Sequence, residues 1–490
     1  MAIDVNNVEI EVMRPSTDTR VNMKKDLGSF TGFVDMYAVN KYQFLNEAYA
    51  GNGGFETNSY LVPYPVESYY DYRRKFSHYV NFFAPVLDAM IRPCFEMEPQ
   101  RKCEGSLYAD PFFADCDGAG RTLTEFMKDA ATLLRRHGVA YVMVDNVTAD
   151  DMPKTAAEAV AARAFPYVSL KSHAEVEGLK VDRFGALCDV VFADGTELVS
   201  DGNNGTKKVS CYKRINASEQ VRFFREGEKE VVLTRFPCPG VFPVVALRIG
   251  LPADHEEFAP FPAMFTLARL CHAIYNKDSE IREIERKQEF AILTVQGGLG
   301  DVAAGAGSML GYPMEATHAP AYIAPDPATL MGLLASRKEL REDLYRIAEQ
   351  SGVTGVAEAK SGVALAFEFR ALAFVLNETS NLCEVMERGI MKAVFSFTGE
   401  RGARFETAYR RAFSHTDGKE ETALDEALLA MDIPKKFKDD ILVDLYRKRF
   451  PESTKEEIDE IKAELEKTAI DEAHGADGIG VADTGTGGGE

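Results

Sequence analysis

The feature that most constrains the fold is a long apolar segment in the last third of the chain, residues 361–399 (SGVALAFEFRALAFVLNETSNLCEVMERGIMKAVFSFTG). It contains no proline, and its internal glycines are Gly362 and Gly389. A stretch of this kind predicts a helix far longer than average. The polar cluster Asn377-Glu378-Thr379-Ser380 interrupts its apolar pattern about midway. Just upstream, residues 342–352 (EDLYRIAEQSG) predict a charged helix that ends at a glycine.

Length and composition indicate a globular protein with several domains. The 490 residues suffice for roughly two to four domain-sized units. No run of about eighteen apolar residues and no signal-peptide pattern occurs, so we expect neither a membrane span nor secretion. The eight cysteines show no CxxC spacing, which predicts reduced, mostly buried thiols. The net charge of −21 disfavours a stable DNA-binding protein, because phosphate binding needs basic patches.

The N-terminal half is expected to contain two helices and then a strand. Aromatic residues recur at helical spacing between Ser68 and Pro93 and predict one helix with an aromatic core face. A stacking platform for nucleic-acid bases is the alternative interpretation of these aromatics. Residues 121–137 predict a second helix, with Gly138 at its C′ position. The residues that follow (AYVMVDN) predict a buried strand.

A β-rich subdomain is predicted between residues 166 and 249, where the hydrophobic period changes to two. Three turn signals favour antiparallel hairpins there: Asp194-Gly195, Asp201-Gly202 and the EGE sequence at 226–228.

The C-terminal half is expected to be mainly helical. Helices are predicted at 261–289 and 326–350, and two short strands, 290–296 and 319–325, lie between them with a Gly/Ala-rich segment. After the long segment at 361–399, two more helices are expected within 418–470. Residues 471–490 are too poor in large apolar groups to form a core.

Motifs that enzymatic chemistry requires are missing. His255 begins HEEF and lacks the second histidine of a zinc-binding HExxH pair. The glycine-rich stretches at 202–208 and 305–311 lack the lysine and hydroxyl of a P-loop, and Ser308 does not lie in a GxSxG motif. We therefore expect no enzyme activity, no cofactor and no metal. A cytosolic enzyme with an unrecognised active site remains the alternative.

Four segments, in this order, resemble one branch of the tailed-bacteriophage portal (head-to-tail connector) family. They are ETNSYLVPYPVESYYDYRRK, RRHGVAYVMVDN, PFPAMFTLARLCHAIYNKDSEIREIERKQEFAIL and SGVALAFEF, and they extend over most of 55–400. The first departs from the family pattern by the inserted Val62 and by the position of Gly53-Gly54 further upstream. The order of the four segments carries the resemblance, because none of them is specific by itself.

The resemblance implies an α+β protein with the portal-protein fold, mainly helical with a β-rich subdomain in the wing and clip, assembled as a ring. The implied parts are a wing (1–255), a stem helix (256–289), a clip (290–355), a segment with the second stem helix, tunnel loop and wing helix (356–400), the end of the wing with a helical crown (401–470), and a flexible tail (471–490).

The resemblance also implies a function and partners. A portal forms a homo-oligomeric ring, usually a dodecamer, at one capsid vertex of the virion, after assembly in the host cytoplasm. Double-stranded DNA passes through the ring non-specifically during packaging and ejection. The implied protein partners are the large terminase subunit, head-completion or adaptor proteins, the major capsid protein and a scaffold protein. Another phage head or adaptor structural protein is a further alternative.

Two groups of site residues follow from the resemblance. The tunnel loop would fall at Asn377, Glu378, Thr379 and Ser380, whose weak polar contacts would let DNA slide. A plain helix with an exposed polar turn is the alternative there. The stem and subunit interface would use charged residues of the helix at 261–289: Lys277, Asp278, Glu280, Arg282, Glu283, Arg286 and Lys287.

Overall fold

The computed structural model describes, with short gaps, residues 34–250, 258–288, 292–294, 317, 321–323, 327–348, 362–413, 435–449 and 457–465. The predicted tail 471–490, most of the predicted clip (290–355), His255 and Asp201-Gly202 lie outside these residues. The chain divides into two compact units, Met1–Phe413 and Ser414–Glu490.

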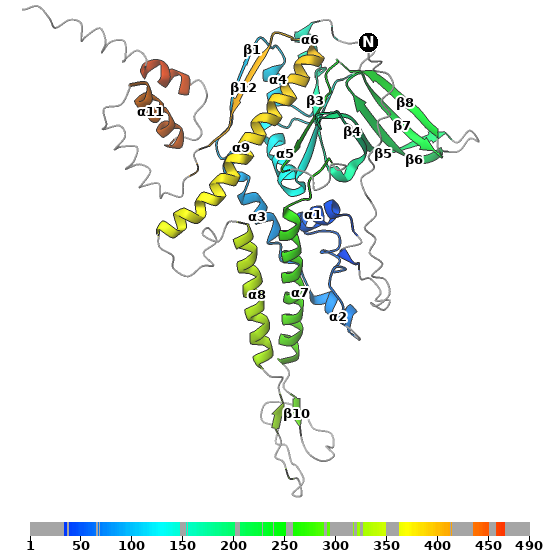
Figure 1. Ribbon diagram of the computed structural model, residues 1–490, viewed down its shortest axis with the longest axis vertical. Coiled ribbons are helices and arrows are strands. Elements are labelled where there is room, and N and C mark those ends of the chain that lie inside the picture. Colours follow the sequence, from blue (N-terminus) through cyan, green and yellow to red (C-terminus); the bar gives the residue numbers. More distant parts are fainter. Residues whose placement is uncertain are drawn as a thin grey trace, which may run out of the picture. The chain divides into compact units, whose positions relative to one another are not determined.

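The first unit contains both helices and strands, as an α+β fold requires (Figure 1). Its helices are α1 (Lys41–Ala50), α2 (Tyr70–Phe76), α3 (Phe83–Ala89), α4 (Ala109–Ala114), α5 (Leu123–His137), α6 (Ala156–Ala161), α7 (Met264–Gln288), α8 (Pro327–Ile347) and α9 (Gly362–Thr398). Its strands are β1 (Gln100–Glu104), β2 (Val139–Asp145), β3 (Tyr167–Lys171), β4 (Val176–Val181), β5 (Leu187–Ser200), β6 (Thr206–Asn216), β7 (Glu219–Glu226), β8 (Lys229–Pro237), β9 (Val244–Arg248), β10 (Ile292–Thr294), β11 (Ala321–Ile323) and β12 (Arg404–Ala408). The second unit contains α11 (Lys435–Arg449).

The predicted helix at 121–137 and the strand after it are confirmed as α5 and β2. A capping box between Thr122 and Glu125 starts α5, and Gly138 ends it with φ of 74°. All seven residues of β2 are buried, because β2 is the central strand of the antiparallel sheet β3-β2-β9.

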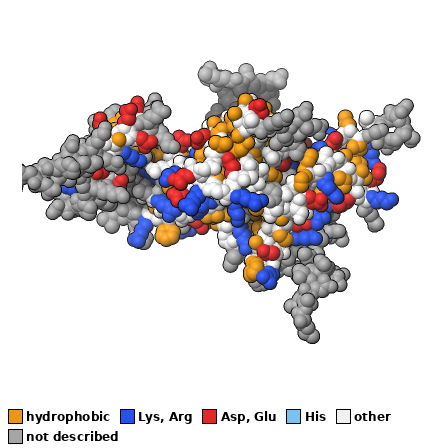
Figure 2. Space-filling view, turned by 90° about the horizontal axis from the view of Figure 1, so that it is seen from above, with side chains coloured by type: hydrophobic (Ala, Val, Ile, Leu, Met, Phe, Trp, Pro, Cys, Tyr) orange, Lys and Arg blue, Asp and Glu red, His pale blue; other side chains and the backbone are white. Residues whose placement is uncertain are grey.

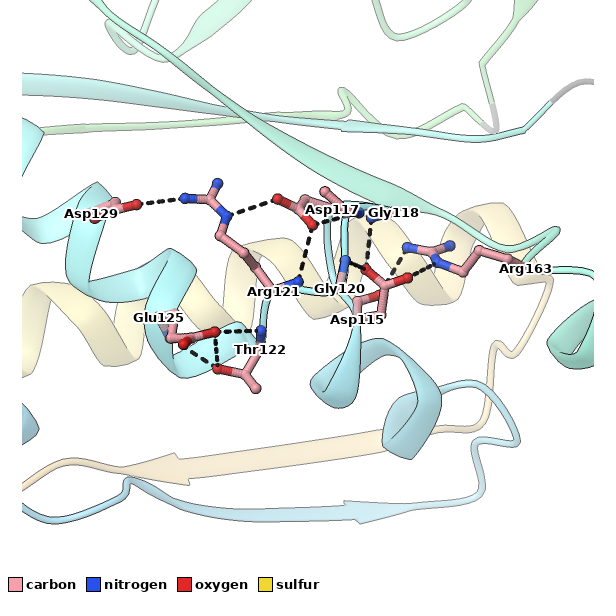
Figure 3. A network of polar contacts seen from close by, with 10 residues as sticks. Asp115, Asp117, Gly118, Gly120, Arg121, Thr122, Glu125, Asp129 and Arg163 are labelled. Carbon is pink, nitrogen blue, oxygen red and sulfur yellow. Dashed lines mark hydrogen bonds and ion pairs between the residues drawn. The ribbon is translucent and has the colours of Figure 1, made fainter.

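A network of polar contacts fixes the loop that leads into α5 (Figure 3). Asp115 accepts hydrogen bonds from the backbone N–H groups of Gly118 and Gly120, and the Arg163 Nε lies 2.6 Å from its other oxygen. Arg121 pairs with Asp129 on the next turns. The carboxylate of Asp115 is thus used by donors of its own chain, and the loop holds the start of α5 in place.

The β-rich subdomain is confirmed as an antiparallel five-stranded sheet of order β4-β5-β6-β7-β8. The EGE sequence forms a tight hairpin in which Glu226 pairs with Lys229. The hairpin predicted at Asp194-Gly195 is wrong. This dipeptide lies inside β5, where the register with β6 shifts between Ala193 and Thr196 and Gly195 has φ of 74°. A β-bulge needs the same left-handed glycine as a turn, so the sequence signal does not separate the two.

The prediction of a single helix between Ser68 and Pro93 is also wrong. It is divided into α2 and α3, with extended backbone between them. Pro85 gives the physical reason, because its ring would clash with the carbonyl of Asn81 in a continuous helix. The Asn81 side chain instead accepts a hydrogen bond from the backbone N–H of Ala84 at the start of α3. The predicted aromatic core is confirmed in part: Tyr60, Tyr70 and Phe83 are buried in the main hydrophobic cluster, whereas Tyr72 is 57% exposed.

The last part of the first unit is built on three long helices. α7 packs against α8 in antiparallel orientation, and the strands β10 and β11 pair at the far end of this helix pair (Figure 1). The first half of α7 and the end of α8 join the main core through Leu267, Ile274 and Leu344. α9 then runs for 37 residues across the unit and packs against β2, β9 and β12.

A glycine sets how closely α9 approaches the sheet. A Cβ atom on Gly389 would lie 2.9 Å from Val245 Cγ1 of β9, which is shorter than carbon atoms tolerate. We expect Gly389→Ala to destabilise the protein by about 1 kcal/mol, because the steric cost exceeds the helix-propensity gain. In a Val245→Ala background the same change should stabilise it by about 1 kcal/mol. Urea denaturation of the wild type, the two single variants and the double variant measures this coupling, and additive effects would contradict the close contact.

Candidate functional site

The predicted tunnel-loop residues lie in the middle of α9. The helix is continuous from Gly362 to Thr398, so the prediction of a loop at Asn377–Ser380 is wrong. Thr379 and Ser380 are buried. The Thr379 hydroxyl donates to the Val375 carbonyl at 2.8 Å, and the Ser380 hydroxyl donates to the Arg410 carbonyl at 2.7 Å. The polar cluster therefore binds its own chain, and these two hydroxyls are not available to DNA.

Arg135 of α5 explains why polar residues occur at this point of α9. Its Nε donates to the Thr379 hydroxyl at 2.9 Å and its Nη2 to the Val375 carbonyl at 2.7 Å. Its guanidinium also pairs with Glu378 at 2.8 Å, where the Glu378 side chain is 52% exposed. Asn377, beside it, is half-buried. The cluster thus attaches α9 to α5.

A second buried polar group, which the sequence analysis missed, holds the next turns of α9. The Glu387 side chain is fully buried and lies 2.5 Å from Arg101 of β1. It accepts hydrogen bonds from the hydroxyls of Thr407 at 2.7 Å and Tyr409 at 2.6 Å. Burial, together with the nearby Glu387, raises the pKa of Tyr409 well above its ordinary value, so Tyr409 stays a donor. Glu384, one turn earlier, accepts from Arg411 at 2.6 Å.

One face of α9 is exposed. Its residues recur at steps of three and four, and they are Arg370, Phe374, Glu378, Asn381, Val385, Arg388 and Lys392. Phe374 is 77% exposed and Val385 45% exposed.

Most of the predicted interface residues of α7 contact residues of their own chain. Asp278 is buried and forms an ion pair with Arg337 of α8. Arg282 lies 2.6 Å from both ring nitrogens of His78, and Arg286 lies over the Phe76 ring at 4.5 Å. Lys277 and Glu280 pair within the helix at 2.8 Å and stay half-buried, as does Glu283. The side chain of Lys287 lies outside the described residues.

The Asp278–Arg337 pair shows which helix accompanies α7. The resemblance placed the second stem helix, the partner of this helix, within 356–400, and in the structure α8 occupies this position. The N-terminal part of α8 carries exposed apolar side chains: Met331 is 64% exposed and Leu334 is 37% exposed.

Arg73 joins the Tyr/Arg-rich N-terminal segment to α7. Its side chain is 2% exposed and pairs with Glu67 at 2.7 Å. It donates to Ser279 of α7 at 3.0 Å and lies over the Tyr64 ring at 4.4 Å. Arg73 is therefore a structural side chain and not part of a basic surface.

The described surface carries charges of both signs. From above, Figure 2 shows Lys and Arg side chains next to Asp and Glu side chains on this face. Within the described ranges, no group of three His, Cys, Asp or Glu side chains could hold a metal ion. In the same part of the chain, no helix is long and apolar enough to cross a membrane. All eight cysteines are free and none is exposed, as predicted.

Two histidines that the fold desolvates predict acid sensitivity: His137 is fully buried and His173 is half-buried. Burial lowers the pKa of His137 to about 3 and that of His173 to about 4. Both are neutral in the folded protein, whereas the unfolded chain binds protons below about pH 6.5. The stability should therefore fall as the pH decreases from about 6.5 to about 4, by on the order of 3 kcal/mol for each histidine. Urea denaturation at several pH values measures this slope. His173→Gln should reduce it, and an unchanged slope would contradict the assignment.

Neither a family model nor a curated protein sequence matches this chain. In structure it is similar to a chain in the neck of an empty gene transfer agent particle, with 10% identity, a TM-score of 0.43, and coverage of 72% of this chain and 87% of that chain. It is also similar to a chain in the virion of a native gene transfer agent particle, with 12% identity, a TM-score of 0.40, and coverage of 80% and 96%. TM-scores below 0.5 do not establish a function for this chain.

Proposed function

We propose that this chain is the subunit of a portal ring of a tailed-phage particle, a non-catalytic channel for DNA packaging and ejection. The observation that carries the proposal is the antiparallel pair α7–α8, with the two-stranded antiparallel sheet β10–β11 at its end. Met331 and Leu334 on α8 remain exposed in the single chain. A ring of copies would cover these side chains, because each subunit of a closed ring uses two different surfaces to contact its neighbours.

The parts of the portal are assigned from the helices that the structure describes. α7 and α8 are the stem, the segment between them (289–326) is the clip, and α9 is the wing helix. In the portal family that this sequence resembles, the tunnel loop connects the second stem helix to the wing helix. With α8 as the second stem helix, this loop is the connection at 349–361, which lies outside the described residues.

The proposed partners follow from these assignments. The clip contacts the large terminase subunit and later the head-completion or adaptor proteins. The wing contacts the major capsid protein and a scaffold protein. The net charge of −21 suits a channel that does not bind phosphate groups tightly, so that DNA can slide.

Native mass spectrometry and negative-stain imaging of the purified protein test this function. We expect rings of about twelve copies with a central channel. A stable monomer would contradict the proposal and favour an enzyme. Oligomers without a channel would instead indicate another head or adaptor protein.

A further inference from the structure

Arg136, in the last turn of α5, has no hydrogen-bonded or ion-paired acceptor among the described residues, and the carboxylate of Asp129 favours its charge only from a longer distance. Its Nε is buried without a hydrogen-bond partner, and among the described residues no carboxylate pairs with the guanidinium. The group lies over the Tyr49 ring, with 4.8 Å between the guanidinium carbon and the ring centroid. Arg135, its neighbour in sequence, pairs with Glu378. Two adjacent arginines of one helix therefore differ in whether their charge is compensated.

The Tyr49 ring compensates the charge only in part. Burial, and a hydrogen bond to Asp88, raise the pKa of Tyr49 to about 12, so its hydroxyl stays neutral and supplies no negative charge. Arg136 in turn cannot release its proton at any ordinary pH. Desolvation lowers the pKa of Arg136, which means that burial makes its charged form less stable. The single chain thus keeps a charge that an external anion would stabilise.

Arg136 lines an open pocket of about 540 Å³ between α1 and α5. Two carboxylates line it as well, and the chain itself uses both. Glu47 accepts hydrogen bonds from the Tyr60 hydroxyl at 2.6 Å and from the backbone N–H of Gly54 at 3.0 Å. Glu175 pairs with Lys171 at 3.0 Å. Neither neutralises Arg136.

We propose that this pocket is a receptor for a carboxylate, supplied by an Asp or Glu side chain of a second copy of the chain. The inference rests on the proposed ring. The two terminal nitrogens of a guanidinium can bind both oxygens of one carboxylate. Each copy carries 77 acidic residues against 56 Lys and Arg, so a neighbouring copy offers carboxylates in excess.

The variant Arg136→Met tests the proposal, because it has two expected effects of opposite sign. The dissociated subunit of the variant, obtained in high salt, should melt at a higher temperature than the wild-type subunit, since a half-buried charge without an ion-pair partner is removed. The ring should dissociate at a salt concentration at least several-fold lower, since the contact between copies is lost. Native mass spectrometry across a salt series and thermal melting of the subunit measure the two effects. Lys128→Gln is the matched control: it removes one positive charge from the exposed face of α5 and should change neither.

The outcomes distinguish a failure of this inference from a failure of the proposed portal function. If wild-type rings form and Arg136→Met rings are equally salt-resistant, the receptor role is overturned. If acetate raises the melting temperature of the wild-type subunit while the rings of both proteins resist salt equally, the carboxylate comes from a free anion and not from a second copy. If the wild-type protein forms no ring at all, the portal proposal fails first, and the inference fails with it.

Discussion

The double variant Met331→Glu/Leu334→Glu is expected to abolish ring formation and leave single subunits. Both side chains are exposed on α8, where the described part of the chain does not cover them. Burying an apolar side chain of this size at a subunit contact stabilises it by about 1.5–3 kcal/mol. Each substitution removes this contribution at every contact of the ring and places a charge there. The combined loss exceeds what a ring with mixed-sign contacts can tolerate.

Native mass spectrometry of the purified variant measures this effect, and circular dichroism verifies that the subunit keeps its helices. Phe184→Glu is the matched control, because Phe184 is 78% exposed in the connection between β4 and β5, away from α8. The control should form rings like the wild type. Intact rings of the double variant would show that this face of α8 does not contact a neighbour.

The second large effect concerns stability. Glu387→Ala is expected to lower the free energy of unfolding by about 3–5 kcal/mol, because Arg101 then remains buried without its partner. The hydroxyls of Thr407 and Tyr409 lose their acceptor as well. Urea denaturation of the subunit measures the change. Glu378→Ala is the comparison on the same helix. Arg135 is also buried, but the Glu378 side chain is 52% exposed and Arg135 keeps its hydrogen bonds to Thr379 and Val375, so the loss should be smaller, about 1–2 kcal/mol.

A further variant separates the charge from the packing. Arg101→Met/Glu387→Met removes both charges and should recover most of the stability that Glu387→Ala loses, because an apolar pair does not leave a buried ion unpaired. If Glu387→Ala unfolds like the wild type, the carboxylate does not hold α9 to β1 and β12.

The sequence predicted those parts of the fold that depend on local signals. The capping residues of α5, the buried strand β2 and the tight hairpin at Gly227 follow from a few neighbouring residues each. The division between α2 and α3 also had a local signal, Pro85, which the helical spacing of the aromatics obscured.

The candidate site depended on contacts between residues far apart in the sequence, and it was predicted less well. Arg135 and Thr379 are 244 positions apart, and Arg101 and Glu387 are 286 apart. A polar cluster inside an apolar segment fits an exposed loop and a buried ion pair equally well when the partner is unknown. The same limit applies to α8, because nothing in its own residues indicates that Arg337 pairs with Asp278.

The unbroken course of α9 has a mechanical consequence. A helix of 37 residues is about 55 Å long. Arg135 attaches it near its middle, and Arg101 attaches it again two turns later. A rod fastened at two such points cannot pivot, so the middle of α9 is fixed in direction and its first and last turns extend from this fixed part. A displacement of one end relative to the other must therefore bend the helix or break one of the two arginine contacts.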